Sequence, residues 1–271
     1  MSNHADLHIH TTASDGDLDP AAVPAVAREA GLAVVALTDH DRFHEDFPAP
    51  VIRTDGVTVV HGIELKVQTE MAGRIDLLGY DLDPTTALRE EITRLQHDRI
   101  ERGAAIIENV ESHLDISLNL EATEGIGRPH IARAVAEHPA TEYDVQGVFD
   151  DLIADGQPCF VPRAVTPFET GKRLLSDACS IVGIAHPLRY ADPTAVLELA
   201  ADVDAIERAY PYEEPVDLTP VDRTIETHDL LATGGSDAHD NQIGRVGLSA
   251  VDYEPVAARL PTPVDAELSQ S

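Results

Sequence analysis

The sequence predicts an α/β protein built mainly from parallel strands, because short apolar runs alternate with segments of helical pattern. Seven runs have the length and apolar character of buried strands: Leu7–Ile9, Ala33–Leu37, Val57–Val60, Ile75–Gly79, Ile181–Ala185, Ala205–Ile206 and Leu230–Ala232. Helix signals lie between them, since Asp19-Pro20 and Asp192-Pro193 each supply an N-cap followed by a first-turn proline, and Gly31 marks a helix end. His, Asp and Glu residues follow several runs, which places them at the carboxyl ends of strands, where barrel enzymes build their sites.

The pattern becomes mostly helical in the middle of the chain, between about Pro84 and Pro158. It predicts one long polar helix and two shorter ones, over residues 86–113, 129–136 and 145–154. We therefore divide the chain into three parts: a barrel domain (1–83 and 159–250), a helical insertion over the barrel mouth that forms a substrate wall (84–158), and a loose, proline- and acid-rich surface tail (251–271).

The charge balance predicts a strongly acidic surface, because 49 Asp and Glu stand against 19 Lys and Arg, for a formal charge of −30. Only Lys66 and Lys172 are lysine, and this acidic, lysine-poor composition is typical of a halophilic protein from a high-salt cytoplasm. Such a surface repels nucleic acid and anionic membranes at moderate salt, whereas molar salt shortens the screening length to ~3 Å and removes most of that repulsion.

Targeting signals and disulfides are not expected. No run approaches the ~18 apolar residues of a membrane span, and the N-terminal MSNHADLHIH lacks the basic and apolar parts of a signal sequence. Cys159 and Cys179 are too few for a disulfide framework or a Cys-rich zinc site. We therefore expect a cytoplasmic protein that needs no membrane and no obligatory protein partner.

Potential metal ligands follow five of the apolar runs. His8 and His10 are two positions apart, so on a strand both point to the same face, as a shared metal ion requires. The other strand-end segments are Thr38-Asp39-His40-Asp41, Gly62-Ile63-Glu64, Ile184-Ala185-His186-Pro187 and Gly234-Gly235-Ser236-Asp237-Ala238-His239. Each segment alone could be an ordinary turn or loop, but five of them at strand ends predict a metal site.

Together these segments resemble the PHP (polymerase and histidinol phosphatase) superfamily of metal-dependent phosphoesterases. The resemblance covers residues 6–239 and also includes Ser14-Asp15-Gly16. Within the superfamily the chain is most similar to 3′,5′-nucleoside bisphosphate phosphatases and 5′-to-3′ exoribonucleases, on the evidence of the segment 127–132 (GRPHIA) and of Arg189. The resemblance implies a distorted (β/α)₇ TIM-like barrel that holds two or three divalent ions, for which imidazole and carboxylate ligands favour Mn, Zn or Fe.

The resemblance also implies which residues bind the ions. A first ion would be held by His8, His10, Glu64 and Asp237, a second by Glu64, Asp76 and His186, and a third by Asp15, His40 and His239. Asp76 stands where relatives often have a histidine, so it either ligates through oxygen or only caps a loop. Three divalent ions against the four carboxylates leave a charge of about +2, which would attract a phosphate group.

The predicted reaction is direct hydrolysis, in which a hydroxide bridging the metals attacks phosphorus in line. Arg128 and Arg189 would neutralise phosphate oxygens, unless they serve only in surface salt bridges, and His130 would hold phosphate or protonate the leaving oxygen. We expect a small phosphorylated substrate, either a nucleotide or a short RNA or DNA oligonucleotide.

Three alternatives remain open from the sequence. The first is a phosphatase of the histidinol-phosphate type, which would present the same phosphate to the same ions. The second is an amidohydrolase-like C–N hydrolase, but those enzymes often bridge their metals with a carboxylated lysine, for which only Lys66 and Lys172 are available. The third is a non-catalytic PHP module that only binds metal.

Overall fold

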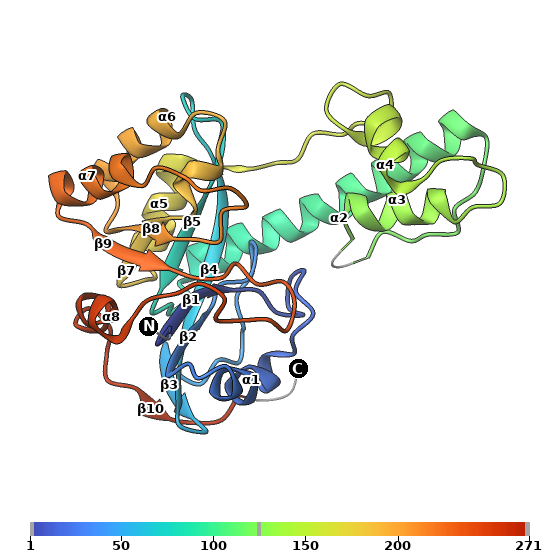
Figure 1. The fold of residues 1–271 in the computed structure, drawn as a ribbon. Helices are drawn as coiled ribbons and strands as arrows, with labels where there is room; N and C mark the ends of the chain where they lie inside the picture. Colours follow the sequence, from blue (N-terminus) through green and yellow to red (C-terminus); the bar gives the residue numbers. More distant parts are fainter. Residues whose placement is uncertain (1–2, 124–125, 269–271) are drawn as a thin grey trace. The chain divides into compact units, whose positions relative to one another are not determined.

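The computed structural model describes residues 3–123 and 126–268, which form two compact units. The first unit comprises Met1–Arg89 and Thr166–Ser271, and the second comprises Glu90–Val165. The first unit has an α/β fold with a curled sheet and helices outside it, whereas the second is helical (Figure 1). None of the helices in the described part of the chain is both long and apolar enough to cross a membrane.

Seven strands form the main path of the sheet, and each of the seven predicted runs overlaps one of them. In spatial order they are β1 (Ala5–Ile9), β2 (Val34–Leu37), β4 (Val57–Gln68), β5 (Arg74–Tyr80), β7 (Ile181–Ile184), β8 (Ala205–Ala209) and β9 (Leu231–Gly234). Successive residues of a strand face opposite sides of the sheet: Val34 and Ala36 pack in one core cluster, and Val35 and Leu37 pack in another. Burial of both faces explains why this run is apolar throughout.

The strand β5 runs antiparallel to both of its neighbours, β4 and β7, whereas the other pairs along the main path are parallel. The predicted parallel direction of Ile75–Gly79 is therefore wrong. A five-residue turn joins β4 to β5, in which the Thr69 amide donates to the Gly73 carbonyl at 2.7 Å and Gly73 adopts φ +73°. Such a short connection permits only an antiparallel pair, and it interrupts the regular (β/α)₇ repeat.

The first unit has helices at both predicted Asp-Pro signals and at further, unpredicted positions. They are η1 (Pro20–Ala22), α1 (Val23–Glu29), α5 (Phe168–Ser176), η3 (Pro187–Arg189), α6 (Pro193–Glu198), η4 (Leu199–Asp202), α7 (Thr219–His228) and α8 (Ala250–Ala257). Asp19 caps η1 by accepting from the Ala21 amide at 2.8 Å, and Asp192 caps α6 in the same way. Gly31 follows α1 with φ +78°, a left-handed conformation that glycine adopts without strain.

The C-terminal segment differs from the predicted loose tail. Helix α8 buries Tyr253 and Val256 in a core cluster, because these two residues are three apart and share a helix face. Three strands also went unpredicted, namely β3 (Val51–Thr54), β6 (Thr166–Pro167) and β10 (Val264–Asp265), and β10 pairs with β3. Residues 269–271 of the predicted tail lie outside the described residues.

The predicted helices of the central segment are present. They are α2 (Thr86–Leu114), which begins in the first unit, α3 (Arg128–Ala136), α4 (Val145–Val148) and a π-helical turn η2 (Phe149–Ile153). The second unit has its own core, in which Val110 of α2 packs with Ile131 and Val135 of α3. Its role as a wall over the site stays a prediction.

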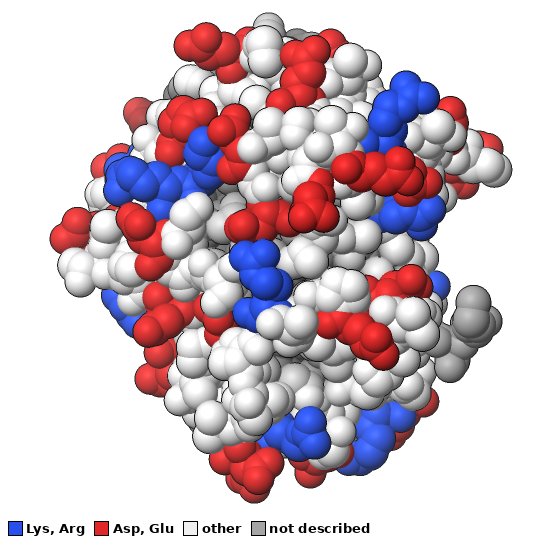
Figure 2. Space-filling model, turned by 90° about the vertical axis from the view of Figure 1, so that its left-hand side faces the viewer, with Lys and Arg blue, Asp and Glu red and all other residues white. Residues whose placement is uncertain are grey.

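On the face drawn in Figure 2, acidic side chains are spread over the whole surface, and basic side chains are less frequent. This distribution agrees with the excess of carboxylates in the sequence.

Candidate metal centre

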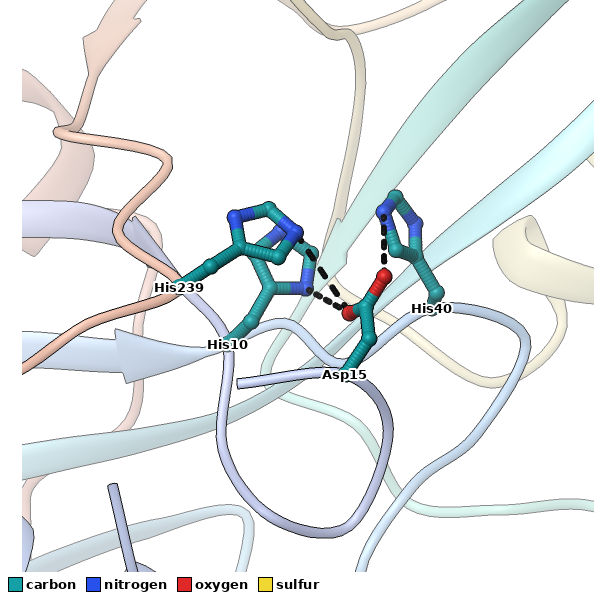
Figure 3. Close-up of side chains that lie close together, drawn as sticks. All are labelled: His10, Asp15, His40 and His239. Carbon is teal, nitrogen blue, oxygen red and sulfur yellow. Dashed lines mark ion pairs between the residues drawn. The ribbon is translucent and has the colours of Figure 1, made fainter. Parts of the chain in front are cut away.

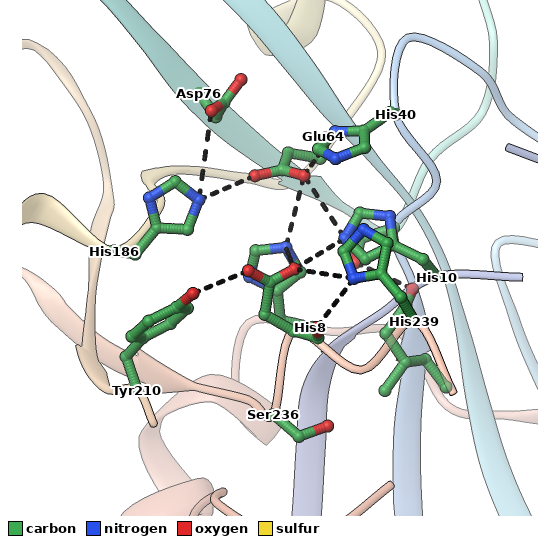
Figure 4. A network of polar contacts seen from close by, with 12 residues as sticks. His8, His10, His40, Glu64, Asp76, His186, Tyr210, Ser236 and His239 are labelled. Atoms are coloured by element: carbon green, nitrogen blue, oxygen red, sulfur yellow. Dashed lines mark hydrogen bonds and ion pairs between the residues drawn. The ribbon is translucent and has the colours of Figure 1, made fainter. Parts of the chain in front are cut away.

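The nine predicted metal ligands lie together at one edge of the sheet of the first unit (Figure 4). They are His8, His10, Asp15, His40, Glu64, Asp76, His186, Asp237 and His239. Figure 4 labels all of them except Asp15 and Asp237. They form three adjoining groups, and within each group the potential ligand atoms lie within 4.8 Å of one another. The antiparallel direction of β5 brings Asp76 to this edge, because it places the start of β5 beside the end of β4.

The first group, which we call the buried cluster, consists of His8, His10, Glu64 and Asp237. His8 lies on β1 and His10 directly follows the end of that strand. Both histidines are fully buried, as is Glu64 of β4. Nε2 of His10 lies 3.0 Å from Oδ1 of Asp237, and Nε2 of His8 lies 3.4 Å from Oε2 of Glu64.

The second group, the exposed cluster, consists of Asp15, His40 and His239, with Nδ1 of His10 beside them (Figure 3). Nε2 of His239 lies 3.4 Å from one oxygen of Asp15, and Nε2 of His40 lies 3.9 Å from the other. The Asp15 side chain is 51% exposed and that of His239 is 39% exposed, so this cluster opens to solvent.

The third group, the Asp76 cluster, consists of Glu64, Asp76 and His186. Glu64 belongs to two groups because its two oxygens face different partners. Oε1 lies 3.1 Å from Nε2 of His186, whereas Oε2 lies 2.7 Å from Nδ1 of His40. Asp76 is more distant, with Oδ2 at 4.0 Å from Nε2 of His186, and its other oxygen forms an ion pair with Lys66.

The donor atoms of the buried cluster fit a divalent cation. Nε2 of His8 is buried and makes no hydrogen bond within the described part of the chain. Oε2 of Glu64 is also buried, and imidazole nitrogens of His8, His10 and His40 surround it at 2.7 to 3.4 Å. Buried polar atoms in proteins almost always have a hydrogen-bond partner, so atoms of ligand type that converge without one are suited to a metal ion.

Charges within the site shift several pKa values. Burial alone would lower the pKa of His8, but the carboxylates of Glu207 and Glu64 raise it well above its ordinary value. Burial would likewise lower the pKa of His40, yet Glu64 and Asp15 raise it to about 9. Burial would raise the pKa of Glu64, but the adjacent histidines hold it well below its usual range. The site therefore favours its ionised carboxylates.

The sequence analysis missed Glu207, a fully buried carboxylate on β8. One oxygen lies 3.0 Å from Nδ1 of His8, and the other accepts the His186 amide at 2.7 Å. A carboxylate on one ring nitrogen of a histidine fixes the tautomer that leaves the other nitrogen free for a metal. Glu207 directly follows the apolar run Ala205–Ile206, so the strand-end rule that identified Glu64 could have identified it.

Two further missed carboxylates hold the loops that carry ligands. Oδ1 of Asp39 accepts from the Thr11 amide at 2.8 Å and from the Ser14 hydroxyl at 2.6 Å, so it fixes the loop that presents Asp15. Asp6 accepts from both the amide and the hydroxyl of Ser236, next to Asp237. Asp39 and Asp6, which are not predicted ligands themselves, therefore position the ligands.

The structure places the three predicted substrate residues in different units. Arg189 lies beside the metal centre, where its guanidinium donates to Asp237 at 3.1 Å and to the Tyr210 hydroxyl at 2.8 Å. It lines a cavity of about 340 Å³ with Lys66, Tyr190 and several of the nine ligands.

Arg128 and His130 lie on α3 of the second unit. Nδ1 of His130 accepts from the Gly127 amide at 3.2 Å, and the Arg128 guanidinium stacks 5.7 Å from the centre of the Phe149 ring. Their predicted contact with substrate stays a prediction.

Residues 6–182 match the family model of the PHP domain. Two relatives of known name are each 29% identical to the chain. The 5′-3′ exoribonuclease Rnm of Escherichia coli matches over 86% of this chain and 84% of its own length. The 3′,5′-nucleoside bisphosphate phosphatase of Chromobacterium violaceum matches over 86% of both chains.

Two solved structures share the fold over almost the whole chain. One is described as an amidohydrolase from Chromobacterium violaceum with bound sulfate and no metal, with a TM-score of 0.73, 25% identity and coverage of 97% of this chain and 99% of that one. The other, from Bifidobacterium adolescentis, has a TM-score of 0.75, 22% identity and coverage of 97% and 98%, and supports the fold alone.

Proposed function

The chain belongs to the PHP domain family, and we propose that it hydrolyses phosphate esters of nucleotides or short oligonucleotides with the help of divalent metal ions. The observation that carries this proposal is the convergence of nine imidazole and carboxylate side chains beside an arginine. The names of the two relatives, a nucleoside bisphosphate phosphatase and an exoribonuclease, point to nucleotide or RNA substrates.

The buried cluster would hold one ion, and the exposed cluster would hold another. The mixture of imidazole and carboxylate ligands suits Mn, Zn or Fe. Bound divalent ions would make a water molecule more acidic and stabilise the negative charge that develops on the phosphate. Within the chain itself, the adjacent histidines would keep Glu64 ionised, Glu207 would orient the His8 ring, and Asp6 would hold the loop that carries Asp237.

Arg189 is the substrate-binding residue that the geometry favours most. Its planar guanidinium suits phosphate oxygens, and the Tyr210 hydroxyl and Asp237 orient it from one side. Its side chain is 52% exposed, so it can reach a substrate in the cavity. Arg128 and His130 remain proposed phosphate contacts from the second unit, and the second unit remains the proposed substrate wall.

A phosphate-release screen tests the proposal. The purified chain with Mn²⁺ would be offered nucleoside monophosphates and bisphosphates, histidinol phosphate and pentanucleotides, at low and molar salt. We expect inorganic phosphate or shortened oligonucleotides from the nucleotide substrates. Turnover of histidinol phosphate alone would favour the small-molecule phosphatase.

The same preparation would also be offered N-acyl and cyclic amide substrates. Amide cleavage without any phosphate release would favour a C–N hydrolase, as the description of one solved relative suggests. Metal binding without turnover of any substrate would favour the non-catalytic module.

A further inference from the structure

Lys66 lies on the same strand as the predicted ligand Glu64 and beside the predicted ligand Asp76. It follows Glu64 by two residues on β4, so both side chains lie on the same face of the strand. In the β4–β5 ladder Lys66 stands directly opposite Asp76, and its ammonium group forms an ion pair with Oδ1 of Asp76. Lys66 also lines the cavity of about 340 Å³ that contains Arg189 and His186.

The carboxylate oxygens of the Asp76 cluster already have partners within the protein. One oxygen of Asp76 pairs with Lys66, and the Tyr190 hydroxyl lies 3.4 Å from the other and accepts the Asp76 amide at 2.8 Å. Oε1 of Glu64 lies 3.1 Å from Nε2 of His186. The buried cluster differs, because there the buried Nε2 of His8 has no hydrogen-bond partner among the described residues.

The low lysine content of the chain makes the position of Lys66 in the site informative. The chain has two lysines among its 19 basic residues, so lysine is rare on its surface, and one of the two points into the site. The other, Lys172 of α5, pairs with Glu169 and Asp202. An ammonium group beside Asp76 opposes a divalent ion there by charge repulsion and by occupying a ligand oxygen.

We propose that Lys66 is the resident cation of the Asp76 cluster, so that the chain holds two divalent ions rather than three. Its ammonium group, a compact point charge, then contacts the substrate phosphate on the side of the cavity where a further ion would otherwise lie. Two divalent ions and Lys66 together exceed the four ligand carboxylates by one positive charge, so the site still attracts an anion. This inference rests on the proposed function, because it presupposes that the other two clusters bind metal.

Counting the bound ions tests the proposal without relying on activity. The full chain and its variants would be saturated with Mn²⁺, freed of unbound ion by gel filtration and measured by elemental analysis. We expect about two ions per chain for the wild type and for Lys66→Arg, which keeps the charge, and about three for Lys66→Met. Lys172→Met serves as the matched control and should match the wild type.

A wild-type count of three, or the same count of two in Lys66→Met, would overturn the proposal. Circular dichroism checks that each variant folds, and Lys66→Gln, which keeps a donor to Asp76 without the charge, replaces Lys66→Met if that variant does not fold. Phosphate release is measured separately on the same samples. Two ions with no release from any substrate would contradict the proposed function only, whereas release with three wild-type ions would contradict the Lys66 proposal only.

Discussion

The buried cluster and the exposed cluster contain the same types of ligand but differ in their support. Glu207 orients His8 in the buried cluster, and Asp6 holds the loop of Asp237, so these ligands are fixed before any ion binds. The exposed cluster depends on Asp15, whose loop is held by Asp39 and whose side chain is half exposed. Because of this difference, we expect an ion to bind more tightly in the buried cluster and the exposed cluster to lose its ion first.

Removing one ligand from each cluster should give the largest contrast. We expect Asp237→Ala to lower kcat/KM on the order of 1000-fold, because the buried ion contributes several kcal/mol of charge stabilisation. His239→Ala should cost only about tenfold and be partly restored by excess Mn²⁺. His8→Ala should resemble Asp237→Ala. Phosphate release checks these values, and His228→Ala, on the exposed end of α7, is the control.

Removing the support of the buried cluster should have the next largest effect. Glu207→Gln keeps the size of the side chain but has a single acceptor for both His8 and the His186 amide. We expect about 10- to 100-fold weaker Mn²⁺ binding at the buried cluster and unchanged binding at the exposed one. Calorimetric titration would resolve the two, and an equal loss at both clusters would contradict the comparison.

The support of the exposed cluster predicts a pH-dependent stability. Burial would raise the pKa of Asp39, but the hydrogen bond and charge of His44, with bonds from Ser14 and Thr11, lower it to about 2. A lowered pKa stabilises the fold above the ordinary value of the carboxyl group and loses that effect as the pH falls toward 2. Asp39→Asn should therefore lower the free energy of unfolding by about 2 kcal/mol at pH 6 and much less near pH 2.

Urea denaturation at both pH values measures this change. Asp17→Asn, an exposed substitution in the neighbouring turn, serves as the control. An equal effect of Asp39→Asn at both pH values would show that the carboxylate charge is not what holds the loop.

The smallest expected effect concerns Arg189, which donates to Asp237 of the buried cluster and also lines the cavity. Arg189→Ala should raise KM for phosphorylated substrates about tenfold with little change in kcat, since it removes one charged contact to phosphate. Arg189→Lys should restore only part of the loss, because a lysine lacks the planar fork. An unchanged KM would show that Arg189 does not bind the substrate phosphate, and its hydrogen bond to Asp237 would then be structural only.

The sequence was informative wherever an apolar run ended in ligand-type residues. The apolar runs located the seven strands of the main path, and the ligand-type residues after five of them predicted that His8, Glu64 and His186 lie at one edge with Asp237, as the structure has them. The apolar runs did not reveal that β5 is antiparallel to its neighbours. The turn at residues 69–73 has to be identified before the pairing of β4 with β5 can be deduced. The partnership of Lys66 with Asp76 depends on the same ladder register, which residue types alone do not determine.

The buried support of the site was missed for another reason. Glu207 resembles an ordinary strand-end residue. Its role arises from contacts with His8 and His186, which lie 199 and 21 positions away from it in the chain. Helix α8 packs against a core contributed by distant strands. The proline- and acid-rich composition of this segment gives no sign of that packing.

The β4–β5 hairpin described above also bears on how the chain reaches its native state. Its contacts are local in sequence, and contacts between near neighbours close at a low cost in chain entropy, so we expect this hairpin to form early during folding. It brings Glu64, Lys66 and Asp76 together by itself. His8 and Asp237 come from opposite ends of the chain and must await the meeting of β1 with β9, so completion of the pocket would report the final closure of the fold.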